Sequence, residues 1–214
     1  MKTLMKIAAL ILLFVSTSII VSCDKNDEDE NLPDNNTPVL NDADAEGLIF
    51  MREEEKLARD SYIKMYELWT DQVFNNITQS EQTHMDLLLV RVEEFGLKDK
   101  DVVLPDTGKF VNQDLQKLYD QLVQQGTDSI IAAFIVGATI EEVDIVDLHK
   151  FIDKTENEDL KCTYNVLITG SRNHLRAFVK GMNNVGYTYC PQYLDSTEYQ
   201  NIINGSHEKA PSCN

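Results

Sequence analysis

The sequence of 214 residues has little that would force the chain to turn, since it contains only five prolines and nine glycines. Between Pro38 and Pro191 the only proline is Pro105, so most of the chain carries no obligatory helix break. Sheets made of many short strands need frequent turn residues, and this scarcity therefore argues against a many-stranded β fold. It favours a small number of long helices.

Positive charge is scarce as well, with 19 Lys and Arg against 36 Asp and Glu and a formal net charge of -17. A chain this acidic repels phosphate backbones, which excludes nucleic acid as a partner. Glycine-rich phosphate loops and nucleophile-elbow motifs are also missing. The proportions of hydrophobic residues (43%) and charged residues (26%) are typical of a globular domain. Nothing in the sequence predicts an oligomeric state.

The one long hydrophobic run lies at the N-terminus, at residues 7–21, and follows Lys2 and Lys6. A short positive segment, an apolar stretch and a small residue at the end are typical of a secretory signal. Residues 20–23, Ile-Val-Ser-Cys, resemble a bacterial lipobox, so we expect cleavage after residue 22 and acylation of Cys23. A plain signal peptide is the alternative. The expected location is the cell envelope, with a lipid anchor in the outer membrane facing the periplasm or the surface.

The rest of the chain divides by composition into three parts. Residues 23–45 are rich in Asp, Asn and Pro and nearly free of large apolar side chains, which predicts a disordered acidic tether after the signal at residues 1–22. A folded domain is predicted over residues 46–204. Residues 205–214 are predicted to form a C-terminal tail.

Helical periodicity fills the predicted domain in four long segments, at about residues 45–69, 71–95, 128–154 and 156–184. Shorter helical stretches are expected at about residues 113–125 and 196–203. Tight turns near Thr70 and Asn157 join the helices of each pair, and one long connection joins the two pairs. The pattern predicts an all-α fold, a ferritin-like four-helix bundle with a short crossover helix and a C-terminal tail.

Polar residues interrupt the apolar face of each long segment. They are Glu55, Glu81, His84, Glu141, Asp144, Ser171 and His174. Each lies about 11 to 17 residues from the turn of its own hairpin, so all of them converge at one level near the middle of the bundle. A carboxylate or imidazole in a bundle core costs several kcal/mol unless it is paired, hydrogen-bonded or bound to a metal.

Carboxylates and imidazoles at the middle of a bundle are the ligands that ferritin-like carboxylate proteins use to bind two metal ions. The spacing Glu81-x-x-His84 places both side chains on one helix face. The predicted metal ligands are Glu55, Glu81, His84, Glu141, Asp144 and His174. Hard oxygen donors with borderline imidazole nitrogens suit iron, and manganese or zinc is also compatible.

Two resemblances support this interpretation. The stretch EEKLARDSY at residues 54–62 resembles the first-helix motif of rubrerythrins, which selects Glu55 as the ligand over Glu53 and Glu54. More closely, REEEKLARDSY, SEQTHM, GATIEEVDIVDL and GSRNHLRAF together resemble the ferritin-like DUF2202 family over residues 46–204. The resemblance implies the fold and does not imply an activity.

The fourth long helix departs from the rubrerythrin pattern, in which the second and fourth helices each carry Glu-x-x-His. Ser171 stands three residues before His174, where that pattern has Glu. Either Asp144, one turn beyond Glu141, supplies the missing carboxylate, or the site holds one metal ion, so a mononuclear and a di-iron site both remain open. A metal-free alternative pairs the buried acids with Arg52, Arg59, Arg172 or Arg176.

Three functions fit these patterns. The first is a metal-dependent oxidoreductase of the cell envelope that acts on dioxygen, peroxide or ferrous iron. The second is a metal-free structural or binding module on a degenerate bundle, and the third is metal sequestration without turnover. The sequence contains no Cys-x-x-Cys pair, so an electron path resembling that of rubrerythrin is missing.

The cysteines other than Cys23 suggest one disulfide. Cys162 and Cys190 are predicted beyond opposite ends of the fourth long helix, about 40 Å apart, which is too far for a bond. The tail cysteine Cys213 can reach either, and Cys190 is nearer in sequence. We therefore predict at most one intramolecular bridge, Cys190–Cys213, with Cys162 free.

Three further polar residues have simple interpretations. Tyr62 lies on the apolar face of the first long helix and is predicted to be a core tyrosine hydrogen-bonded to a buried acid. His149 is expected at the surface, and His207 is expected to be solvated in the tail.

Overall fold

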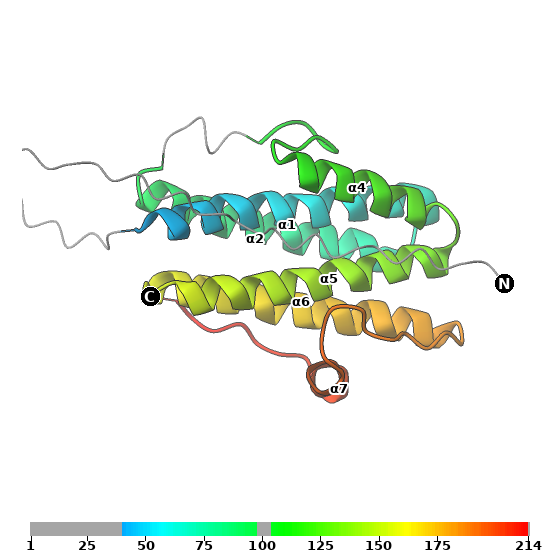
Figure 1. Cartoon of the computed structure of the whole chain (residues 1–214). Coiled ribbons are helices and arrows are strands. Elements are labelled where there is room, and N and C mark those ends of the chain that lie inside the picture. The colour runs from blue at the N-terminus through cyan, green and yellow to red at the C-terminus, as the bar shows by residue number, and fades with distance from the viewer. Residues whose placement is uncertain (1–39, 98–103, 214) are drawn as a thin grey trace, which may run out of the picture. The chain divides into compact units, whose positions relative to one another are not determined.

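The structure, a computed structural model, describes residues 40–97 and 104–213 (Figure 1). The predicted signal segment, the predicted lipidation site Cys23 and the tether up to residue 39 lie outside the described residues. In the described part of the chain, no helix combines the length and the hydrophobicity that a membrane span needs.

The described residues form helices and no strand, which confirms the predicted all-α class. The helices are α1 (Asp42–Trp69), α2 (Gln72–Glu94), α4 (Gln113–Gly126), α5 (Ile130–Lys154), α6 (Glu158–Asn184) and α7 (Ser196–Asn204). Only α1 begins clearly earlier than predicted. Asn41 and Asp44 form a capping box, in which each side chain bonds the backbone N–H of the other residue, and this starts the helix inside the acidic segment.

The long helices pack as two antiparallel pairs (Figure 1). Helix α1 packs on α2 and α5 packs on α6; α1 also contacts α5, and α2 contacts α6. Thr70, in the left-handed region with φ 53°, and the N-cap Asp71 reverse the chain between α1 and α2. The turn before α6 ends at the N-cap Asn157, whose side chain accepts two backbone N–H bonds. The four long helices therefore form a bundle joined by one long crossover.

The crossover is held against α1 by a buried ion pair. Lys56 Nζ lies 2.5 Å from Asp60 and also donates to the backbone oxygens of Asp106 and Lys109, each at 3.0 Å. The backbone N–H of Gly108 donates to Asp60 at 2.8 Å. Both charged side chains are buried, and α4 packs on α1. The single apolar stripe of α1 did not predict this burial.

The segment after α6 is held by Glu142, a fully buried residue of α5. Its carboxylate accepts hydrogen bonds from the Tyr189 hydroxyl at 2.6 Å and from the backbone N–H groups of Gln192, Tyr193 and Leu194 at 2.9, 2.7 and 2.9 Å. Four donors satisfy one buried carboxylate and fix the loop that leads into α7. Glu142 therefore has a structural role, although it adjoins Glu141.

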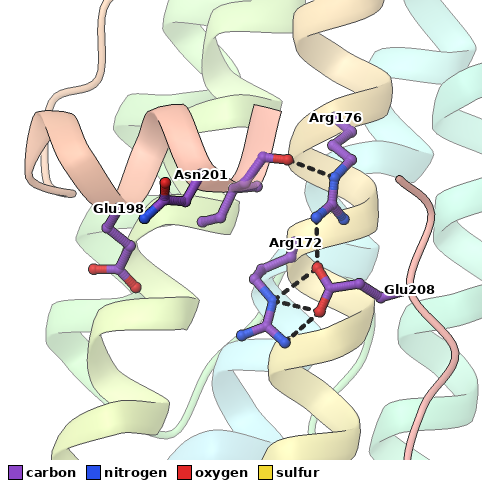
Figure 2. Close-up of a pocket in the computed structure, with 6 residues that line it drawn as sticks. Arg172, Arg176, Glu198, Asn201 and Glu208 are labelled. Carbon is purple, nitrogen blue, oxygen red and sulfur yellow. Dashed lines mark hydrogen bonds and ion pairs between the residues drawn. The ribbon is translucent and has the colours of Figure 1, made fainter. Parts of the chain in front are cut away.

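The C-terminal tail returns along the outer side of α6 (Figure 2). Glu208 accepts hydrogen bonds from Arg172, the shortest at 2.5 Å, and from Arg176 at 2.5 Å. The backbone N–H and C=O of Glu208 also bond the Asn173 side chain at 2.9 and 3.0 Å. The tail thus runs from the middle of α6 toward its start. His207, which precedes Glu208, is exposed as predicted.

The predicted disulfide Cys190–Cys213 is wrong. Cys213 instead bonds Cys162, with their Cα atoms 5.7 Å apart, and Cys190 is free and exposed. Cys162 lies inside the first turns of α6 rather than beyond its end. Because the Glu208 contacts direct the tail toward the start of α6, Cys213 ends beside Cys162 and not beside Cys190. Sequence proximity was a poor guide because the tail is bound along its length.

Replacing Cys213 by Ser is expected to lower the free energy of unfolding by about 2 to 4 kcal/mol, because the bridge closes a loop over 51 residues in the unfolded chain. Urea unfolding of the oxidised wild type and of Cys213→Ser measures the difference. Cys190→Ser is the matched control and should leave the midpoint unchanged. A Cys190–Cys213 peptide in mass mapping of the wild type would contradict the bridge.

Candidate metal centre

Glu81 lies between two imidazoles at the centre of the bundle. One carboxylate oxygen, Oε2, is 2.9 Å from Nδ1 of His84, and the other, Oε1, is 2.9 Å from Nδ1 of His174. The His84 ring is one turn further along α2, and the His174 ring comes from α6. The centroids of the two imidazole rings lie 5.7 Å apart. A single carboxylate therefore joins two nitrogen donors, one through each oxygen.

A second carboxylate completes each half of the centre. Glu55 Oε2 of α1 is 3.1 Å from Nδ1 of His84, and Glu141 Oε2 of α5 is 3.4 Å from Nδ1 of His174. In each half, one ligand atom from every residue lies within 4.8 Å of the others. The first half consists of Glu55, Glu81 and His84, the second of Glu81, Glu141 and His174, and all are buried. The two halves share Glu81.

Asp144 is a fourth buried carboxylate, and it lies outside both of these groups. Its Oδ2 accepts a hydrogen bond from the Ser171 hydroxyl, and Glu55, Glu141 and Glu81 all act on it electrostatically. Its Oδ1 is buried and has no hydrogen-bond partner within the described residues. The structure thus brings five of the six predicted residues into these two groups, while Asp144 interacts with them electrostatically. That a metal binds them stays a prediction. Ser171 stands where the rubrerythrin pattern has a carboxylate. Its hydroxyl instead holds the carboxylate of Asp144, which comes from α5.

The buried carboxyl groups at the centre outnumber the imidazoles, and their pKa values respond to this crowding. Burial, opposed by His84, raises the pKa of the Glu55 carboxyl to about 8. Burial also raises the pKa of Asp144 well above its ordinary value, and Glu55 adds to the effect. Burial lowers the pKa of an imidazole, but Glu81 and Glu141 outweigh it and raise the pKa of His174 to about 10. Without a cation the cluster therefore retains protons, which a bound metal would displace.

The residues around the centre orient its ligands. Tyr62 donates a hydrogen bond to Glu141 Oε1 at 2.5 Å, which confirms the prediction of a core tyrosine bonded to a buried acid. Burial and the Glu141 charge raise the pKa of Tyr62 well above its ordinary value, so its hydroxyl keeps its proton. The second nitrogen of His174 lies 2.9 Å from the Ser80 hydroxyl, a contact that the sequence did not predict.

Gly170 makes room for the His84 ring. A Cβ atom at this position would lie 2.4 Å from His84 Cε1 and 2.5 Å from Nε2. Glycine inside a helix lowers stability by about 1 kcal/mol relative to alanine. An interior glycine at position 170 was therefore a signal in the sequence that another group packs closely against the helix there. This close contact was not among the predicted ones.

Three of the four arginines in the metal-free alternative bond other residues. Arg59 contacts Asp60 at 2.8 Å and Gln82 at 2.6 Å. Arg172 and Arg176 both contact Glu208. The fourth, Arg52, interacts electrostatically with Asp86 and Glu93. In the described contacts, imidazoles face the carboxylates of the two groups, and Arg59 pairs with a different buried acid, Asp60.

Comparison with known proteins places the chain in a family. Residues 44–206 match the family described as Uncharacterized protein domain (DUF2202). The uncharacterized protein MJ0754 of Methanocaldococcus jannaschii is 49% identical over 170 residues, which cover 79% of this chain and 91% of that protein. The crystal structure of hypothetical protein MJ0754 has a TM-score of 0.76 at 46% identity, covering 84% of this chain and 100% of that chain. By sequence and by fold, the chain belongs to the DUF2202 family.

Proposed function

We propose that this protein binds two divalent metal ions, with iron as the expected metal, in the core of a ferritin-like bundle. The observation that carries the proposal is Glu81, whose two oxygens face two different imidazoles at 2.9 Å each. Glu81 belongs to both groups of candidate ligands, and each of its oxygens could therefore serve a different metal ion. Glu81 Oε1 and Nδ1 of His174 are close but not aligned for a hydrogen bond, and both atoms lack a hydrogen-bond partner within the described part.

The charge of the centre supports two ions rather than one. The four carboxylates of Glu55, Glu81, Glu141 and Asp144 are all buried. Two divalent cations would balance four ionised carboxylates, whereas with one cation two of the carboxyls would have to keep their protons, because an uncompensated buried charge is costly. Asp144 supplies the fourth carboxylate that Ser171 cannot.

The donor set fits iron, and manganese or zinc can occupy the same oxygens and nitrogens. Bound iron would supply one-electron chemistry toward dioxygen, peroxide or ferrous iron. The protein's own residues keep the centre dry, orient His174 through Ser80, and hold a proton on Tyr62 beside Glu141. Acylation of Cys23 would anchor this centre at the cell envelope, most simply at the outer membrane.

Metal stoichiometry tests the proposal. The purified protein, incubated anaerobically with excess Fe(II) and desalted, should retain about two equivalents by elemental analysis. Asp144→Ala should lose the second equivalent, because it removes one of the four carboxylates. Adding Ser171→Glu to the Asp144→Ala variant should restore the second equivalent of metal. The Ser171 and Asp144 side chains are hydrogen-bonded to each other, so a carboxylate at position 171 would lie near the one that was removed.

The control removes the exposed carboxylate of Glu158, which pairs only with a lysine one turn away in the described contacts. Glu158→Ala should retain both equivalents. One equivalent in the wild type would establish a mononuclear site. No retained metal would favour the metal-free module, which has its own support because each imidazole already contacts two carboxylates. Two equivalents without consumption of oxygen or peroxide would indicate sequestration.

A further inference from the structure

Three consecutive glutamates of α1 are buried and have different surroundings. Glu53 accepts hydrogen bonds from the backbone N–H groups of Val111 and Asn112 and so holds the start of α4. Glu55 faces His84 in the metal centre. Glu54 lies between them in sequence, is 4% exposed, and has neither role. Its burial needs another explanation.

Glu54 faces other acids rather than hydrogen-bond donors. Its carboxyl lies within hydrogen-bonding reach of Asp147 on α5, and Asp144 and Lys150 act on it electrostatically. Its Oε2 atom is buried and has no hydrogen-bond partner among the described residues. A buried carboxyl without a donor is destabilising, so packing alone does not account for it.

The acids near Glu54 lead from the surface to the metal centre. Asp144 and Asp147 are three residues apart on α5 and therefore share one side of the helix. The Asp147 side chain is 20% exposed and contacts the exposed Lys150 at 2.6 Å. Asp144, at the other end, is buried with a free Oδ1 within the described part. Glu54 interacts electrostatically with both acids, and its carboxyl is within hydrogen-bonding reach of Asp147.

We propose that Asp147 and Glu54 form an entry path by which a divalent cation passes between α1 and α5 to Asp144 and the metal centre. The path rests on the proposed function, because it needs a centre to supply. Two facing carboxyl groups repel unless a proton or a cation lies between them. Carboxylate oxygens are ligands that divalent iron and manganese accept. The orphaned oxygens of Glu54 and Asp144 then serve as successive transient ligands.

The rate of cation uptake tests the path. Co²⁺, whose visible absorption reports coordination, is mixed with the purified metal-free protein in a stopped-flow instrument. Glu54→Gln should slow uptake about tenfold or more, while the final spectrum and stoichiometry match the wild type. Asp147→Asn should slow it by a smaller factor, because that side chain is partly solvated. The metal-free Glu54→Gln protein should melt at the wild-type temperature or above, since an amide can donate to Asp147.

Glu53→Gln is the matched control on the same helix. It should lower the melting temperature, because its carboxylate is bonded to two backbone amides, and it should take up Co²⁺ at the wild-type rate. A wild-type uptake rate in Glu54→Gln would overturn the path and leave the centre intact. A Glu54→Gln protein destabilised as much as Glu53→Gln would show that Glu54 is structural. Failure of the wild type to bind Co²⁺ would overturn the centre itself, and the path with it.

Discussion

Adding Fe(II) anaerobically, Mn(II) or Zn(II) to the metal-free protein is expected to raise its melting temperature by about 10 to 20 °C. A ligand that binds only the folded state at a hundred times its Kd stabilises it by about 2.7 kcal/mol, so two sites add about 5 kcal/mol. For a domain of this size each kcal/mol shifts the melting temperature by about 2 to 4 °C. Release of repulsion among the four buried carboxylates acts in the same direction.

Differential scanning calorimetry with and without metal measures this shift. His84→Ala and His174→Ala should each remove at least half of the increment, because each deletes the nitrogen donor of one half of the centre. His207→Ala removes an exposed histidine of the tail and should keep the full increment. If none of the three metals shifts the melting temperature, the proposed metal centre is contradicted. A shift that survives both core substitutions would move the site elsewhere, most plausibly to the acidic surface.

Replacing Gly170 by Ala is expected to weaken metal binding by about ten- to a hundredfold, the range seen when an orienting contact of a ligand is lost. The new Cβ would meet two atoms of the His84 ring at 2.4 and 2.5 Å. Because that ring contacts Glu55 and Glu81 through Nδ1, it cannot move without leaving at least one of them. The clash should also destabilise the metal-free protein by about 1 to 3 kcal/mol.

Gly181→Ala is the matched control for this substitution. It lies in the same helix, and its Cβ would meet the Phe134 ring at 3.1 to 3.3 Å, away from the centre. Titration with Co²⁺ should give it the wild-type affinity, and the better helix propensity of alanine offsets part of any crowding. Wild-type affinity in Gly170→Ala would show that the position of His84 does not depend on this glycine.

Local pattern determined most of the fold. Scarce proline and glycine together with helical periodicity placed the helices, and the turns near Thr70 and Asn157, close to where the structure has them. The same periodicity placed Glu55, Glu81 and His84 on inward faces at one level. This worked because which side of a helix is buried, and how far a residue lies from a tight turn, depend on nearby sequence alone.

Contacts between distant segments decided the rest. Helix periodicity does not say which neighbour covers a side, so the burial of Lys56 under the crossover and of Glu142 under the C-terminal loop could not be predicted. The pairing of Ser171 with Asp144 joins two helices, and the choice of Cys162 by Cys213 follows from the path of the tail. Such contacts depend on how whole helices and loops pack, because each side chain meets partners that its own segment does not specify.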